Sequence, residues 1–204
     1  MSSVEDKKRR VRKTREERRS EILDAATKVF VDEGYAELTL RRIAKEVDIR
    51  LSTVQHYFES RESIIKTLIY NRVQTYLSNH AALKEEVTGS GEDKVRAIFK
   101  SLVEDSLNVE TCRFFTQMWA MGFQSDIFRD QLFEMYDCHR EDIAEVIALV
   151  RPDLSPTERF QRATMISSMI EGSLIHLGVG LPSDDRLNGV RERMLEVLVN
   201  LAKT

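Results

Sequence analysis

Apolar residues recur at helical spacing along most of this chain of 204 residues. They fall at positions i, i+3, i+4 and i+7, a pattern that places them on one face of a helix. The first such helix is expected over residues 14–33, and Gly34 follows it as a residue able to adopt the left-handed conformation of a helix end. With only three prolines and eight glycines to interrupt the pattern, the chain is predicted to be all-α.

Two short helices are predicted directly after Gly34. Thr39 can cap the first of them, and the second covers residues 51–57 beyond a tight break at Asp48-Ile49-Arg50. Helices of seven or eight residues are unstable in isolation, so both are expected to pack on the helix at 14–33. The resulting three-helix head has helix-turn-helix geometry.

Longer helices are predicted in the rest of the chain. Ser60 can cap a helix from Arg61 to Glu86, and a flexible break follows at Gly89-Ser90-Gly91. Further helices are expected near residues 92–107, 110–122, 126–150, 156–180 and 184–202, which makes about nine in all. The expected organisation is a disordered basic arm at 1–13, a helix-turn-helix domain at 14–61 and a larger helical domain at 62–204.

Charge is distributed unevenly along the chain, although the net charge at pH 7 is only −3. Residues 1–19 carry nine Lys or Arg against four Asp or Glu, whereas residues 61–204 carry seventeen against twenty-two. A basic arm on a mildly acidic body is typical of a protein that touches nucleic acid at one end only. A solvated, disordered leader would also account for the basic arm.

Composition argues against several other classes of protein. The sequence has no run of about 18 apolar residues, so no membrane partner is expected, and its charged N-terminus is unlike a signal peptide. Cys112 and Cys138 lack metal-type spacing and suit free thiols in a reducing cytoplasm, so neither a metal site nor a cofactor is expected. Without a nucleophile motif or a Gly-rich phosphate loop, a helical enzyme is only a distant alternative.

The helix over residues 51–57 has the polar side chains needed to read a DNA major groove, which admits one α-helix and displays base edges. Gln55 can hydrogen-bond an adenine edge, and Thr53 can contact a thymine methyl or a phosphate. Exposed polar side chains are often simply solvated, but here a capped helix and a tight turn precede them. The residues expected to contact double-stranded DNA are Thr39, Arg41, Arg50, Ser52, Thr53, Gln55, His56, Tyr57 and Arg61.

The segment from Ile22 to Leu68 resembles the DNA-binding domain of TetR-type repressors, the TetR/AcrR family. The matching parts are ILDAA…F…GY in the first helix, LTLRRIAKEV in the second, and STVQHYFESRESI across the third and the start of the fourth. The resemblance implies a homodimer that binds a palindromic operator and releases it when a small-molecule ligand binds the C-terminal domain. An activator, or a regulator without a small-molecule inducer, is the alternative.

Three positions depart from the family pattern. Asp48 stands where a turn glycine is common, and Asp tolerates the left-handed region better than most residues, so the turn is expected to survive. Arg50 replaces the usual cap before the third helix and offers a phosphate partner instead. Gln55 replaces a common aromatic residue, which is expected to alter the operator sequence.

Residues 99–139 hold most of the aromatic and thioether side chains, which either fill a helical core or line an apolar cavity. Glu171 lies within the apolar stretch MISSMIEGSLIHLG. Unless it occupies an exposed edge position, its carboxylate needs a partner, which is an internal ion pair, a backbone amide near Gly172 or a cationic ligand. The carboxylates near His139 fall on several helix faces, which argues against a metal site. Candidate ligand contacts are Phe99, Phe115, Met118, Trp119, Met135, Tyr136, His139, Met169 and Glu171.

The last two predicted helices carry apolar stripes wider than one core requires. One of them carries Val190, Met194, Val197, Leu198 and Leu201, and the preceding helix has a similar stripe of Met165, Ile166, Met169, Ile170, Leu174 and Leu177. A wide stripe suggests a second buried face. Two such helices from each of two subunits would form a four-helix bundle, so homodimerisation is expected here.

Overall fold

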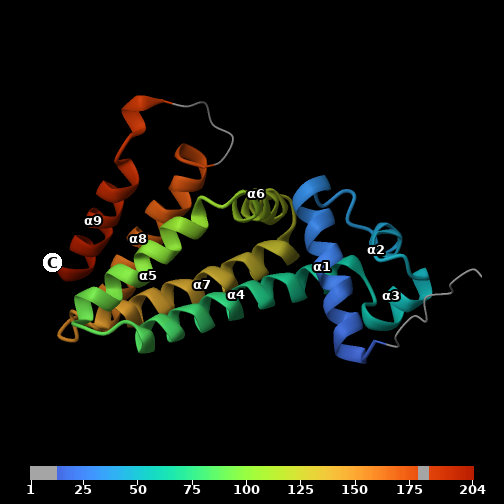
Figure 1. The fold of residues 1–204 in the computed structure, drawn as a ribbon, viewed down its shortest axis with the longest axis horizontal. Helices are drawn as coiled ribbons and strands as arrows, with labels where there is room; N and C mark the ends of the chain where they lie inside the picture. Colours follow the sequence, from blue (N-terminus) through green and yellow to red (C-terminus); the bar gives the residue numbers. More distant parts are fainter. Residues whose placement is uncertain (1–12, 179–183) are drawn as a thin grey trace, which may run out of the picture. The chain divides into compact units, whose positions relative to one another are not determined.

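The computed structural model describes residues 13–178 and 184–204, together with their side chains except that of Ile127. Over these residues the secondary structure is helical, without a strand (Figure 1). The chain divides into two compact units, the first ending at Ile64 and the second extending from Ile65 to Thr204. The disordered arm expected at residues 1–13 lies outside the described residues, except for Lys13. No helix in the described part of the chain is both long enough and apolar enough to cross a membrane.

The first unit comprises three helices and the start of a fourth. They are α1 (Arg15–Glu33), α2 (Leu40–Glu46), α3 (Leu51–Tyr57) and α4 (Arg61–Glu86). The predicted helices at 51–57 and 61–86 are confirmed with the same bounds. Thr14 begins α1 through a capping box with Glu17, and the Thr39 hydroxyl caps α2 by accepting the backbone N–H of Arg42 at 3.0 Å.

Apolar side chains from α1, α2 and α3 form the core of the first unit. Helix α1 packs against α2, and α2 packs against α3. This burial provides the stability that a seven-residue helix lacks alone. The buried residues include Ile22, Ala26, Val29, Phe30, Leu38, Ile43, Ala44, Val54 and Phe58.

The turn between α2 and α3 contains a left-handed residue. Asp48 has a φ of 54°, and it is the one non-glycine residue with a positive φ in the described ranges. Asp adopts this region at lower cost than most residues, because its short polar side chain can hydrogen-bond locally. Arg50 then begins α3 without a side-chain cap, as its place in the sequence predicted. The turn therefore forms without glycine.

The second unit contains most of α4 and the remaining long helices. They are α5 (Gly91–Ser106), α6 (Val109–Gln124), α7 (Asp126–Ala148), α8 (Pro156–His176) and α9 (Val190–Lys203). Helix α7 packs against α6 and α8, and α5 packs against α8 and α9 (Figure 1). Ser155 begins α8 with a capping box to Glu158, and Pro156 occupies the first helical position, as predicted.

Two helix ends differ from the prediction. Helix α8 ends at His176, short of residue 180. Helix α9 begins at Val190 and not at 184, because Asp184 caps a separate 3₁₀ turn (Asp185–Leu187) and Gly189 follows with a φ of 78°. A left-handed glycine interrupts a right-handed helix, so the turn and α9 cannot be continuous.

Replacing Asp48 by Val is expected to lower the free energy of unfolding by about 1–2 kcal/mol, because a β-branched residue fits the left-handed region poorly. Asp48→Gly is the matched control, since glycine enters this region without steric cost and should unfold no earlier than Asp48→Val. Urea denaturation followed by circular dichroism measures both. Equal midpoints for the two variants would contradict the assigned conformation.

Candidate functional site

Helix α3 presents a polar face to solvent because its apolar positions are turned inward. Val54 and Phe58 are buried, and the guanidinium of Arg19 from α1 lies 5.3 Å from the centre of the Phe58 ring. Ser52, Gln55 and His56 are exposed, and Thr53 and Tyr57 are half-buried. The His56 and Tyr57 rings meet edge to face, with their centroids 5.4 Å apart. This face therefore offers hydrogen-bonding groups at the surface of a short, anchored helix.

Cationic side chains flank α3 on both sides. Arg41 and Arg50 are exposed, and neither forms an ion pair with another described residue. Arg61 is already engaged, because its guanidinium lies 4.3 Å from the centre of the Tyr35 ring and its Nε is 3.1 Å from a Glu62 oxygen. Arg41 and Arg50 are thus the better placed pair for phosphate oxygens.

Arg42, which follows Arg41 in α2, has a structural role. It bridges Glu33 at the end of α1, with Nη2–Oε1 at 2.5 Å, and Glu46 at the end of α2, with Nη1–Oε2 at 2.8 Å. The nine residues expected to contact DNA all lie on α2 and its cap, on the cap and body of α3, or at the first residue of α4, and none belongs to the buried core.

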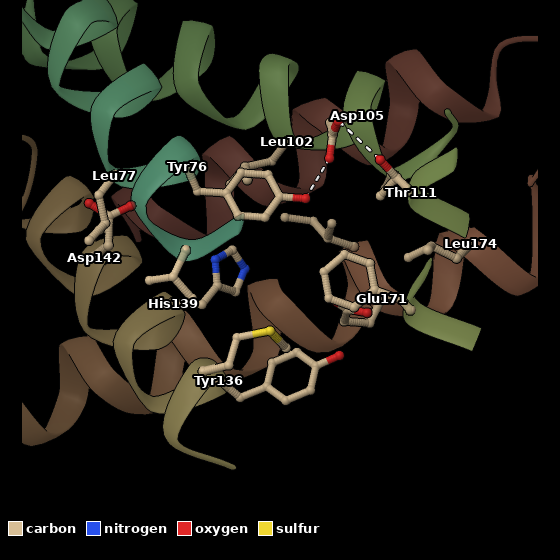
Figure 2. A pocket seen from close by; sticks show the side chains of 15 residues that line it. Tyr76, Leu77, Leu102, Asp105, Thr111, Tyr136, His139, Asp142, Glu171 and Leu174 are labelled. Carbon is tan, nitrogen blue, oxygen red and sulfur yellow. Dashed lines mark hydrogen bonds between the residues drawn. The ribbon is translucent and has the colours of Figure 1, made fainter. Parts of the chain in front are cut away.

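The second unit contains a narrow, partly open cavity among α4, α5, α6, α7 and α8 (Figure 2). Its volume of about 30 Å³ holds the centres of one or two water molecules. The lining is mostly apolar, with a few polar groups. It consists of Val73, Tyr76, Leu77, Leu102, Asp105, Ser106, Thr111, Phe115, Met135, Tyr136, His139, Asp142, Ile170, Glu171 and Leu174.

Five of the nine predicted ligand contacts line this cavity, and four do not. The lining set comprises Phe115, Met135, Tyr136, His139 and Glu171. Phe99 is fully buried in the apolar core of the second unit, and Met169 packs against the same core. Met118 is also fully buried. Trp119 does not line the cavity, but its Nε1 donates a hydrogen bond at 2.7 Å to the hydroxyl of Tyr136, which does. Helical periodicity marks a residue as inward-facing without saying whether it meets a void or another side chain.

Asp105 ties three helices together at the cavity wall, and sequence analysis missed it. The Tyr76 hydroxyl of α4 donates to Asp105 Oδ2 at 2.5 Å, and the Thr111 hydroxyl of α6 donates to Oδ1 at 3.2 Å (Figure 2). Arg72 Nη2 lies 3.5 Å from Oδ2. Burial raises the pKa of Tyr76, so its hydroxyl stays protonated. Asp105 and Tyr76 are 29 residues apart, so no local pattern in the sequence signalled this contact.

Asp142 forms a second buried polar group at the wall. It accepts a hydrogen bond from His80 Nδ1 and lies 3.5 Å from Lys84 Nζ. Although burial acts to raise it, the hydrogen bond and charge of these partners hold the pKa of Asp142 below its usual value. Burial lowers the pKa of His139 to about 4, so this side chain is neutral at pH 7.

Glu171 is the cavity carboxyl group without a cationic partner among the described residues. Its Oε2 is buried and has no hydrogen-bond partner. Burial raises the pKa of Glu171 to about 7, opposed only by a hydrogen bond with Tyr136. The expected alternative of an internal ion pair is therefore wrong for this residue. Figure 2 shows Glu171, Tyr136, His139 and Tyr76 around the same space.

Both cysteines of the described residues lie in the second unit. Cys112 and Cys138 are both free and half-buried, and Cys112 Sγ donates to the backbone carbonyl of Ser106 at 3.1 Å. The described residues contain no cluster of His, Cys, Asp and Glu that could hold a metal ion.

Both units resemble those of known regulatory proteins. The model of bacterial regulatory proteins of the tetR family matches residues 22–68. A helix-turn-helix-type transcriptional regulator in the dhlA 5′ region of Xanthobacter autotrophicus is 30% identical over 145 residues, which cover 68% of this chain and 67% of that protein. The transcriptional repressor KstR2 of Rhodococcus jostii is 32% identical over 89 residues, or 44% of this chain and 41% of that protein. A TetR transcription regulator of Haloarcula marismortui matches with a TM-score of 0.70 at 15% identity, covering 92% of this chain and 97% of that one.

Replacing Glu171 by Gln is expected to raise thermal stability near pH 8 and to have little effect near pH 4. The native state holds the Glu171 proton more tightly than the unfolded chain, so stability falls as the pH rises from about 4.5 to about 7, and the penalty is complete above that range. Gln escapes this penalty, which is on the order of 1–3 kcal/mol. Thermal unfolding at both pH values measures the gain, with exposed Glu141→Gln as control. A pH-independent difference would refute a titrating Glu171.

Proposed function

Because this chain belongs to the tetR family of bacterial regulatory proteins, we propose that it is a dimeric repressor that leaves a palindromic operator when a small molecule binds its second unit. That it is a transcriptional regulator, and not an enzyme, follows from its family. The observation that carries the proposal is the exposed polar face of α3 on a head whose apolar residues are buried. We place its action in the cytoplasm, where bacterial DNA lies.

In this proposal α3 enters the major groove. Gln55 pairs with an adenine edge, and Ser52 contacts a neighbouring base or phosphate. Arg41 and Arg50 neutralise backbone phosphates, which fixes the position of α3 without specifying sequence. The contacts proposed for His56 and Tyr57 follow from their places on α3, and that of Thr39 follows from its exposed position at the start of α2.

The exposed apolar residues of α8 and α9 support a homodimer. Met165 and Ile175 on α8 are 48% and 62% exposed, and Val197 on α9 is 49% exposed. Gly172 lies between the two α8 residues, and a Cβ there would meet no atom within 4 Å. A second copy of the chain would cover this surface by forming a four-helix bundle, and its two-fold axis matches a palindromic operator.

Helix α4 supplies a physical link between ligand and DNA. It begins at Arg61 in the first unit and contributes Val73, Tyr76 and Leu77 to the cavity wall in the second. A ligand that displaces this wall would move a helix continuous with the DNA-binding head. Repression is supported by the name of the Rhodococcus jostii relative, a transcriptional repressor.

One observation favours a regulator without a small-molecule inducer. The inner cavity measures about 30 Å³, whereas pockets for drug-sized ligands span roughly 300–1,000 Å³. A protein partner would then control DNA binding. Titration of the operator complex with a metabolite library distinguishes the two functions, because only an inducible repressor releases DNA.

Gln55→Ala is expected to relax sequence preference, with a loss of about 1–3 kcal/mol on the parent operator and little loss on sites altered at one base pair. Arg41→Ala should weaken all sites alike and reduce the salt dependence, because phosphate contacts are independent of sequence. Fluorescence anisotropy with operator duplexes at several salt concentrations measures both. Equal losses from both substitutions on every duplex would contradict these roles.

Val197→Asp is expected to convert the dimer to a monomer and to weaken operator binding, since a carboxylate would be buried between subunits. Phe133→Asp is the control, because Phe133 is similarly exposed, at 56%, but lies on α7. Light scattering coupled to gel filtration gives the mass of each variant. A dimer that survives Val197→Asp places the interface elsewhere.

A further inference from the structure

A solvent-open groove lies beside the inner cavity, between α4 and α7. It has a volume of about 370 Å³, and its lining includes Lys66, Val73, Gln131, Glu134 and Met135. Val73 and Met135 line both the groove and the inner cavity. These two side chains therefore form the partition between a roomy outer space and a narrow inner one. Met135 is unbranched and can change rotamer, which suits a partition that opens.

The charges around the inner cavity select for a cation. No Lys or Arg is among the lining residues, whereas three carboxyl groups are. Two of these have partners: Asp105 lies near Arg72, and Asp142 contacts His80 and Lys84. Glu171 has no cationic partner among the described residues, and its Oε2 is a buried acceptor without a donor. A ligand that brings a positive charge and N–H donors would satisfy it.

Aromatic rings add to this preference. Tyr76, Phe115 and Tyr136 contribute to the wall, and the face of an aromatic ring attracts cations. The small inner volume admits a primary ammonium group more readily than a bulky quaternary one. In the groove, Gln131 Oε1 is a second buried acceptor without a donor, so it suits a further N–H group on the same ligand.

We propose that the second unit binds a slender alkylamine whose primary ammonium group sits at Glu171 and whose chain passes between Val73 and Met135 into the α4–α7 groove. This inference rests on the proposed sensor function and names the chemical class of its ligand. The groove supplies the volume that the inner cavity lacks. A long, thin ligand would therefore occupy both spaces once the side chains of Val73 and Met135 move apart.

Isothermal titration calorimetry of the full chain near pH 8 tests this, since most Glu171 side chains are ionised above a pKa of about 7. The probes are n-hexylamine, hexanoate and 1-hexanol, which share a chain and differ in charge. We expect saturable binding of n-hexylamine only. We also expect 1,6-diaminohexane to bind more tightly, because its second amine can reach the groove.

Variants locate the bound amine. Glu171→Gln keeps the shape of the side chain and should weaken n-hexylamine binding about tenfold or more, as for a lost charged hydrogen bond. Val73→Phe should also weaken it by narrowing the passage, while Glu141→Gln, an exposed carboxylate on α7, should bind like the parent. Circular dichroism establishes that each variant is folded.

Each outcome separates this inference from the proposed function. Equal binding of 1-hexanol and n-hexylamine, or undiminished binding by Glu171→Gln, overturns the amine assignment. Operator release by a library compound that is not an amine would overturn it too, yet leave the inducible repressor standing. Glu171-dependent binding of n-hexylamine that leaves the operator complex intact supports the site and counts against ligand-induced release.

Discussion

The shortness of α2 and α3 is the constraint on which the DNA-binding head depends. Neither helix can persist alone, so each must bury its apolar stripe in the core that α1 completes. Val54 and Phe58 are buried in this core, so the polar residues of α3 lie on its opposite face. The left-handed Asp48 lets the chain turn within the four residues that separate α2 from α3, which keeps both helices in the same core. Stability and exposure of the reading face thus have one cause.

The second unit follows the opposite logic, because it buries polar groups and pairs several of them across its helices. Asp105 joins α4, α5 and α6, and Asp142 joins α4 and α7. Glu171 differs from these two carboxyl groups, because it is held in a mostly apolar wall without a countercharge among the described residues. A group left in this state raises the free energy of the empty protein and gives a ligand something to gain by binding. Glu171 therefore both destabilises the empty protein and provides the group that a ligand would bind.

Local signals were sufficient to predict most of the fold from sequence. The Thr39 cap, the Ser155-Pro156 start and the 3.6-residue period gave the helices, because caps and periodicity act within a few residues. The end of α8 was missed, and so was the start of α9, because the helix predicted at 184–202 ran through Gly189, whose left-handed conformation separates the 3₁₀ turn from α9. The cavity wall was only partly predictable. Asp105 accepts a hydrogen bond from Tyr76, which lies 29 residues away in the sequence, and the spacing of residues along one helix cannot reveal a partner on another helix.

The reading of DNA by two symmetric α3 helices is tested most directly by selecting binding sequences from a random duplex library with the full-length protein. The account predicts an enriched inverted repeat whose half-site centres lie one or more helical turns apart, about 34–36 Å for a single turn. Recovery of no preferred sequence at any salt concentration, or of a lone half-site without its inverted copy, would contradict it.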